Sequence, residues 1–153
     1  MDDPEKSNNE KPDLLFADLE TGRAFRPLSY PVTPELVADY IETVGDQNPL
    51  YSEGGAAKAA GLDAPFAPPG LAAIYSRLSY LQDHTMPSGG VLAKQEFEFH
   101  GPIPIGERLT VAARVSESYV DKKERKRVNF LIEAKDYNDE LVSITRLYAI
   151  WPL

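Results

Sequence analysis

The feature that most constrains the fold is a change in hydrophobic periodicity near Gly90. After this residue, apolar and polar side chains alternate along five segments, 91–93, 96–99, 109–120, 128–137 and 141–151. Alternation with a period of two is typical of β-strands that bury one face. The charged segment 121–126 and the Asn138-Asp139 pair separate the three longest segments and predict tight turns. The second half of the chain therefore predicts an antiparallel sheet.

The first half of the chain begins with a strong helix signal. Thr33 is a favourable N-cap, Pro34 suits the first helical position, and Gly45 suits the residue that ends a helix. Apolar residues recur between them at spacings of three and four, which predicts an amphipathic helix over 34–44.

Two more helices and one short strand are expected before Gly90. The Ala-rich segment 53–60 predicts a small helix. The segment 70–82 predicts a longer one, with large apolar residues on one side and small residues on the other. A short strand is expected at 23–26. Helices followed by long strands indicate an α+β fold in which a helix packs on a curved antiparallel sheet.

The 153 residues are enough for one ordinary domain, which we place at 13–153. Residues 1–12 contain almost no apolar side chain after Met1, so we expect them to form a disordered tail. This start does not resemble a secretory signal, and no uncharged segment is long enough to span a bilayer. We therefore expect a cytoplasmic protein that does not enter a membrane.

Charge and composition exclude several classes of function. Sixteen basic and twenty-four acidic residues leave a net charge of −8, which argues against nucleic acid as a partner. Cysteine is absent, so thiolate nucleophiles and Cys-ligated metals are excluded. With only two histidines, His84 and His100, a metal site built from several histidines is not expected, and nothing in the sequence requires a cofactor.

The most informative segment follows the first predicted helix. Its sequence is Gly45-Asp46-Gln47-Asn48-Pro49-Leu50-Tyr51, and two later segments, Phe66-Ala67-Pro68-Pro69-Gly70-Leu71 and 95–107, follow at characteristic spacing. Together they resemble the MaoC-like hotdog hydratases and dehydratases, which act on acyl-thioesters. The resemblance extends from about Pro27 to Pro152 and is closest to the fatty-acid-synthase-like N-terminal dehydratase domains. It implies a hotdog fold, an antiparallel sheet wrapped around a central helix.

The resemblance also implies site residues, and the chain departs from the family pattern at two of them. In catalytic members an Asp and a His hold the water that adds to an enoyl thioester. Asp46 matches the Asp, but Tyr51 stands where the His is expected, and Pro69 replaces a second family His. A phenol with a pKa of about 10 can donate a proton at pH 7 but cannot act as the base.

Other positions match the binding apparatus of the family. Gly70 corresponds to the residue whose backbone N–H would polarise the thioester carbonyl, as the N-terminus of a helix can do. Tyr75, one turn further on, lies near the family's polar residue by the acyl group. Asn48 is a third candidate for substrate binding. Asp46 and Tyr51 are the candidate catalytic residues, and no residue is predicted to bind a metal.

Each of these assignments has a simpler alternative. Asp46 and Asn48 could form a turn that caps the helix, and Tyr51 could be a wall of the tunnel. His100 is expected to have a structural or interface role rather than to replace the base. The basic segment 122–127 could meet the phosphates of coenzyme A, or it could be a solvated hairpin.

We therefore predict a MaoC-like (R)-specific enoyl-CoA hydratase or 3-hydroxyacyl dehydratase subunit with a degenerate Asp–Tyr site. Its substrate would be an acyl-CoA or an acyl-carrier-protein thioester. It would pair with itself or with another hotdog subunit, because an exposed edge strand favours pairing. Three alternatives remain: an enzyme that hydrates enoyl-CoA alone, a non-catalytic acyl-CoA-binding or regulatory homo-oligomer, and a thioesterase.

Overall fold

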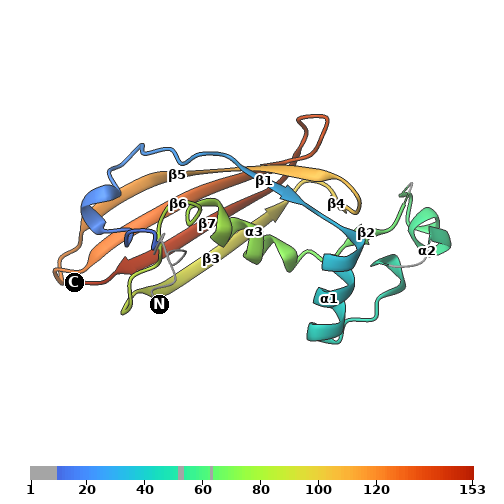
Figure 1. Ribbon diagram of the computed structural model, residues 1–153, viewed down its shortest axis with the longest axis horizontal. Coiled ribbons are helices and arrows are strands. Elements are labelled where there is room, and N and C mark those ends of the chain that lie inside the picture. Colours follow the sequence, from blue (N-terminus) through green and yellow to red (C-terminus); the bar gives the residue numbers. More distant parts are fainter. Residues whose placement is uncertain (1–9, 52–53, 63) are drawn as a thin grey trace, which may run out of the picture.

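A five-stranded antiparallel sheet forms the body of the molecule (Figure 1). The computed structural model describes residues 10–51, 54–62 and 64–153. The sheet has the order β1-β5-β6-β7-β3, and β2 pairs with β4 in a separate small sheet. The strands are β1 (Leu28–Pro31), β2 (Phe66–Ala67), β3 (Val91–Phe99), β4 (Ile103–Pro104), β5 (Arg108–Val120), β6 (Lys126–Lys135) and β7 (Leu141–Trp151).

The helices begin and end close to the predicted positions. They are α1 (Pro34–Val44), α2 (Gly54–Ala59) and α3 (Leu71–Ser79), with two 3-10 turns, η1 (Phe16–Asp18) and η2 (Pro49–Tyr51). The limits of α1 are confirmed, because the Leu36 N–H donates to Thr33 Oγ1 at 3.1 Å and Gly45 ends the helix with a φ of 72°. Among the described residues, no helix has both the length and the apolar character needed to cross a membrane.

The core lies between α3 and one face of the sheet, which confirms the α+β prediction (Figure 1). The buried face of α3 carries two polar contacts to β7. The Tyr75 hydroxyl is hydrogen bonded to Ser143, and Ser76 Oγ lies 2.8 Å from Thr145 Oγ1. Because all four side chains are buried, these bonds offset the cost of removing the hydroxyls from water. They also fix the position of α3 along β7.

Several predicted boundaries were wrong. The expected strand at 23–26 is a single bridge between Ala24 and Arg114, and the regular strand β1 follows it. The two short segments at 91–93 and 96–99 form one strand, with a register shift after Leu92. The third helix ends at Ser79, and β6 lies two residues earlier in the chain than expected. Strand pairing decided the strand limits, and pairing depends on residues far away in the sequence.

The N-terminal segment joins the fold earlier than predicted. Residues 1–9 of the expected tail lie outside the described residues. Pro12 belongs to the fold, because its carbonyl accepts the Thr85 N–H at 3.0 Å, and Asp13 forms a bridge with the same residue. The side chain of Asp13 also accepts the Thr85 hydroxyl at 2.7 Å.

Candidate functional site

The loop after α1 is organised by its own side chains. Asp46 Oδ1 accepts the Asn48 N–H at 3.2 Å, and Asn48 Oδ1 accepts the Leu50 N–H at 3.0 Å. Both side chains are exposed, and each uses one oxygen to fix the local turn. The Asp46 carboxylate also faces Tyr51, because a side-chain hydrogen bond to Asp46 is among the causes that raise the pKa of Tyr51.

Tyr51 lies beside Asp46 at the end of this turn. Burial is the largest cause that raises the pKa of Tyr51, and the negative charge of Asp46 is the second. Its ring packs edge-on against Phe66, with ring centroids 5.6 Å apart. It also lines a cavity of about 400 Å³ together with Val37 and Ile41 of α1. The phenol therefore stays protonated near neutral pH and can donate but not accept a proton.

Gly70 lies immediately before α3, and its backbone N–H has no acceptor within residues 10–51, 54–62 and 64–153. The N–H groups of the next three residues, 71–73, donate in order to the carbonyls of Pro68, Pro69 and Gly70, at 3.0 to 3.1 Å. The Gly70 amide is thus a donor that this end of α3 leaves free, and its role toward a thioester stays a prediction.

Tyr40 of α1 covers Gly70. A Cβ atom at position 70 would overlap the Tyr40 hydroxyl oxygen and would lie 3.3 Å from the ring carbon that bears it. Gly70 has helical backbone angles, with a φ of −59°, so close approach explains the glycine and conformational freedom does not. Tyr40 also contributes to the raised pKa of Tyr51, so it connects the Asp46 loop with the start of α3.

Sequence reasoning missed Tyr40 as part of this cluster. The spacing of α1 assigns it to the apolar face, and the ring does pack against the core. The sequence carries no signal for this contact, because glycine is itself a favoured residue at the position before a helix.

The structure places Tyr75 in the core and not at the surface of the site. Its side chain is 0% exposed, and its ring packs against Tyr30 at a centroid distance of 5.8 Å. Burial raises the pKa of Tyr75 to about 12. Direct contact with a substrate would require the core to open, so substrate binding by Tyr75 stays a prediction that this geometry does not support.

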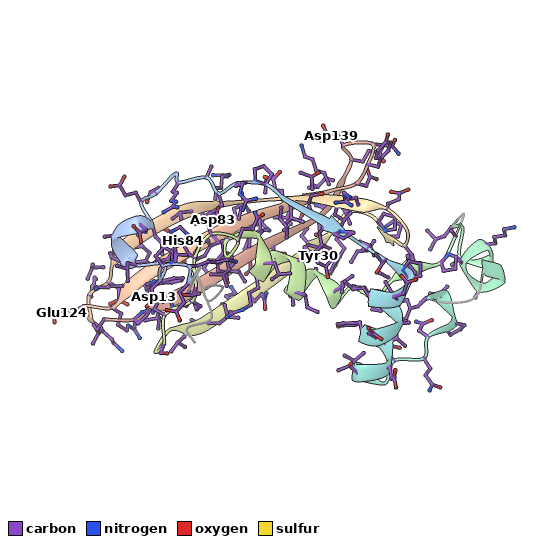
Figure 2. All side chains as sticks on the ribbon, viewed as in Figure 1. Asp13, Tyr30, Asp83, His84, Glu124 and Asp139 are labelled. Carbon is purple, nitrogen blue, oxygen red and sulfur yellow. The ribbon has the colours of Figure 1, made fainter. Side chains whose placement is uncertain are left out.

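The two histidines lie outside the cluster around Asp46. His100 follows β3, with its Nε2 atom 3.5 Å from Glu98 Oε1. His84 lies five residues after the end of α3 and adjoins Asp83 (Figure 2). The Asp83 carboxylate binds Arg26 at 2.8 Å. Neither histidine replaces the one that the family pattern places at position 51.

The basic segment 122–127 forms the hairpin between β5 and β6. Asp121 organises it by accepting the Lys123 and Arg125 N–H groups, both at 2.9 Å, and by binding the side chains of Arg125 and Arg127. Glu124 at its tip lies at the end of the sheet opposite α1 and α2 (Figures 1 and 2). Within one protomer, the hairpin is therefore far from the Asp46 loop, and the structure does not support its contact with a coenzyme there.

Comparison with known proteins identifies the family. Residues 20–143 match the family described as "FAS1-like, dehydratase domain region". A UPF0336 protein of Saccharopolyspora erythraea is 33% identical over 103 residues, which are 63% of this chain and 66% of that protein. A probable enoyl-CoA hydratase alpha subunit of Thermomonospora curvata is 25% identical over 138 residues, 76% of this chain and 43% of that protein. The chain thus spans less than two thirds of the length of each of these relatives.

The fold agrees with this family. The structure of the HadBC complex, a (3R)-hydroxyacyl-ACP dehydratase of Mycobacterium tuberculosis, superposes with a TM-score of 0.74 and 22% identity. The superposition covers 85% of this chain and 96% of that one. The sheet order, the helix packed on the sheet and the family match lead to one conclusion: the chain belongs to the FAS1-like dehydratase family of MaoC-like hotdog proteins.

Proposed function

We propose that the chain is a cytoplasmic subunit of an (R)-specific enoyl-CoA hydratase or 3-hydroxyacyl dehydratase, with an incomplete site of its own. It binds an acyl-thioester, carried by coenzyme A or an acyl carrier protein, at the start of α3. A second hotdog subunit supplies the Asp–His pair. The alpha-subunit name of the T. curvata relative and the two-component HadBC complex support a heteromeric assembly.

The observation that carries this proposal is the pairing of Asp46 with a tyrosine whose pKa is raised. Hydration needs a base that takes a proton from water and an acid that delivers one to the α-carbon. Tyr51 can supply only the acid. The free N–H of Gly70 supports a third role, stabilising the negative charge that develops on the thioester oxygen.

A reaction by this chain alone would divide the work between the two side chains. The water oxygen would bond to C3 of the enoyl group while its proton moves to the Asp46 carboxylate. The electrons of the double bond would take the Tyr51 proton at C2, and Asp46 would then return its proton to Tyr51. A carboxylate is a weak base for this step, so we expect a rate roughly 10²- to 10⁴-fold below that of a site with a histidine.

The proposal is tested with purified chain and trans-2-butenoyl-CoA, by titration calorimetry with the saturated butanoyl-CoA and by loss of enoyl absorbance. We expect binding of the thioester and slow hydration at most. Asp46→Asn should abolish any turnover, whereas Asp39→Asn, a matched change at an exposed carboxylate of α1, should leave it unchanged.

Three outcomes would count against parts of this proposal. Absence of thioester binding would contradict the substrate class. Turnover that survives Asp46→Asn would contradict the role of Asp46. Hydration at the rate of an Asp–His enzyme would contradict the need for a partner. Binding without turnover in every assembly tested would favour the second candidate, a non-catalytic acyl-CoA-binding or regulatory homo-oligomer, because Asp46 and Asn48 already hold a local turn.

A further inference from the structure

A second cavity, of about 430 Å³, lies between the C-terminal half of α3 and the β3–β7 edge of the sheet. Its floor is aromatic and buried. The Tyr80 and Phe130 rings stack with centroids 4.6 Å apart, and the Trp151 ring lies 5.9 Å from Phe130. A volume of this size and an apolar floor are typical of sites for small organic molecules. Asp46, Tyr51 and Gly70 do not line this cavity.

One face of α3 forms the wall of the cavity. Ala73 and Arg77 are four residues apart, so they lie on the same side of the helix, and Tyr80 follows directly after its last residue. Ala73 leaves the space open because its side chain is a single methyl group. Tyr80 closes the bottom with its ring, and Arg77 stands at the rim, where its side chain is exposed.

The polar side chains of the cavity are all able to donate hydrogen bonds. Of the fourteen lining residues, Arg77 is the single charged one, and Gln95 of β3 carries the single amide. The Arg77 charge lies close enough to the Tyr80 hydroxyl to oppose the larger effect of burial, which raises the pKa of Tyr80. No ion pair among the described residues includes Arg77, although the chain carries eight more acidic than basic residues.

We propose that this cavity binds a free carboxylic acid with a medium-length apolar chain. The alkyl chain of the acid lies on the aromatic floor, and its carboxylate accepts hydrogen bonds from Arg77 and the Gln95 amide. An apolar cavity favours the chain, and a guanidinium at its rim without a carboxylate partner favours an anion of planar shape. The inference goes beyond the proposed function, because a thioester group carries no negative charge.

Comparison of octanoate with 1-octanol separates the contribution of the carboxylate to binding from that of the alkyl chain. We expect calorimetric titration of the full chain to show tighter binding of octanoate than of 1-octanol. Arg77→Met should lower the affinity for octanoate about fivefold, which is the upper range for an exposed ion pair. The affinity for 1-octanol should not change. Arg114→Met, at an exposed arginine of β5 outside the cavity, is the matched control and should bind both ligands as the unaltered chain does.

A second variant tests the location. Ala73→Leu fills the wall of the cavity and should weaken both ligands, with circular dichroism confirming that the variant is folded. Equal binding of octanoate and 1-octanol, or octanoate binding unaffected by Arg77→Met, would overturn the carboxylate assignment. Octanoate binding unaffected by a folded Ala73→Leu variant, or absent at millimolar concentration, would overturn the site. None of these measurements uses a thioester or turnover, so their failure is distinct from failure of the proposed function.

Discussion

At the scale of single residues, the contact between Tyr40 and Gly70 joins the two parts of the candidate site. The hydroxyl group of Tyr40 occupies the space that a side chain at position 70 would need. The Tyr40 hydroxyl makes no hydrogen bond to another described residue. Its oxygen therefore restricts position 70 only by the space that it occupies. This contact makes a direct prediction for a pair of substitutions.

We expect Gly70→Ala to destabilise the protein by about 1–3 kcal/mol, the usual cost of forcing a group into filled space. Tyr40→Phe should have a smaller effect, and the double variant should recover much of the loss, because the atom nearest to the new methyl group would then be the ring carbon at 3.3 Å. Urea unfolding of the four proteins measures the coupling. Strictly additive losses would contradict the contact.

The buried Tyr75 predicts a loss of stability at high pH. Its pKa is about 12 in the folded protein and about 10 when unfolded. The folded state holds this proton more tightly, so its contribution is complete below pH 10 and is lost as the pH rises from about 10 to about 12. Tyr75→Phe should cost about 1–2 kcal/mol at pH 8, where Ser143 loses its partner, and less at pH 11. Tyr119→Phe, at an exposed tyrosine, is the control, and a pH-independent difference between wild type and Tyr75→Phe would contradict this account.

At the scale of elements, α1 positions the Asp46 loop, and its ends are set by local chemistry. Thr33 supplies the N-cap, and Gly45 allows the left-handed turn that directs the chain into Asp46. Thr33→Ala should therefore destabilise the protein by about 1 kcal/mol. Thr43→Ala is a matched change inside the same helix and should be nearly neutral, since Thr43 only bonds back to the Asp39 carbonyl. Thermal unfolding measures both, and equal losses would contradict the capping role.

The elements that sequence analysis predicted well are those defined within the chain segment itself. The limits of α1 follow from Thr33, Pro34 and Gly45, and β7 follows from a run rich in β-branched and aromatic residues over Leu141–Trp151. In contrast, β1 ends in a proline and contains only four residues, and it becomes a strand because it pairs with β5, about 80 residues later. Pairing with β5 determines that this segment is a strand, and the sequence of the segment alone does not.

The same reasoning explains which parts of the site could be predicted. Asp46, Asn48 and Tyr51 lie within one short segment, so their grouping follows from the turn itself. Tyr40 and Gly70 come from separate helices, and their contact depends on how α1 packs near α3. Spacing also could not separate the buried Tyr75 from the exposed face of α3, because the depth of a helix against its sheet is a tertiary property.

At the scale of the whole molecule, the two edges of the sheet differ. The β1 edge is short and ends at Pro31, which has no N–H to offer. The β3 edge is nine residues long and carries exposed Val91, Leu92, Phe97 and Phe99, at 39% to 56% exposure. Long apolar edges favour pairing with another strand. We therefore expect a second hotdog subunit to pair along β3.

Substitution of both aromatic residues on β3 tests this expectation. Phe97→Lys combined with Phe99→Lys should shift the protein toward the monomer in sedimentation velocity, because charged side chains on an edge strand oppose pairing. Tyr119→Lys, an aromatic residue of similar exposure on β5, should leave the assembly unchanged. A β3 variant that stays folded and associates as strongly as wild type would place the interface elsewhere.

The strand order has a further consequence for synthesis of the chain. Among the described strands, β3 pairs only with β7, and β7 comes after β4, β5 and β6 in the chain. During translation, the apolar β3 segment therefore emerges long before its neighbour exists and has no partner strand on either side. Such a segment is open to association with other nascent chains or to chaperones until β7 has been made. Closure of the sheet is a late, non-local event, and variants that slow the docking of β7 should reduce soluble yield more than equilibrium stability alone would indicate.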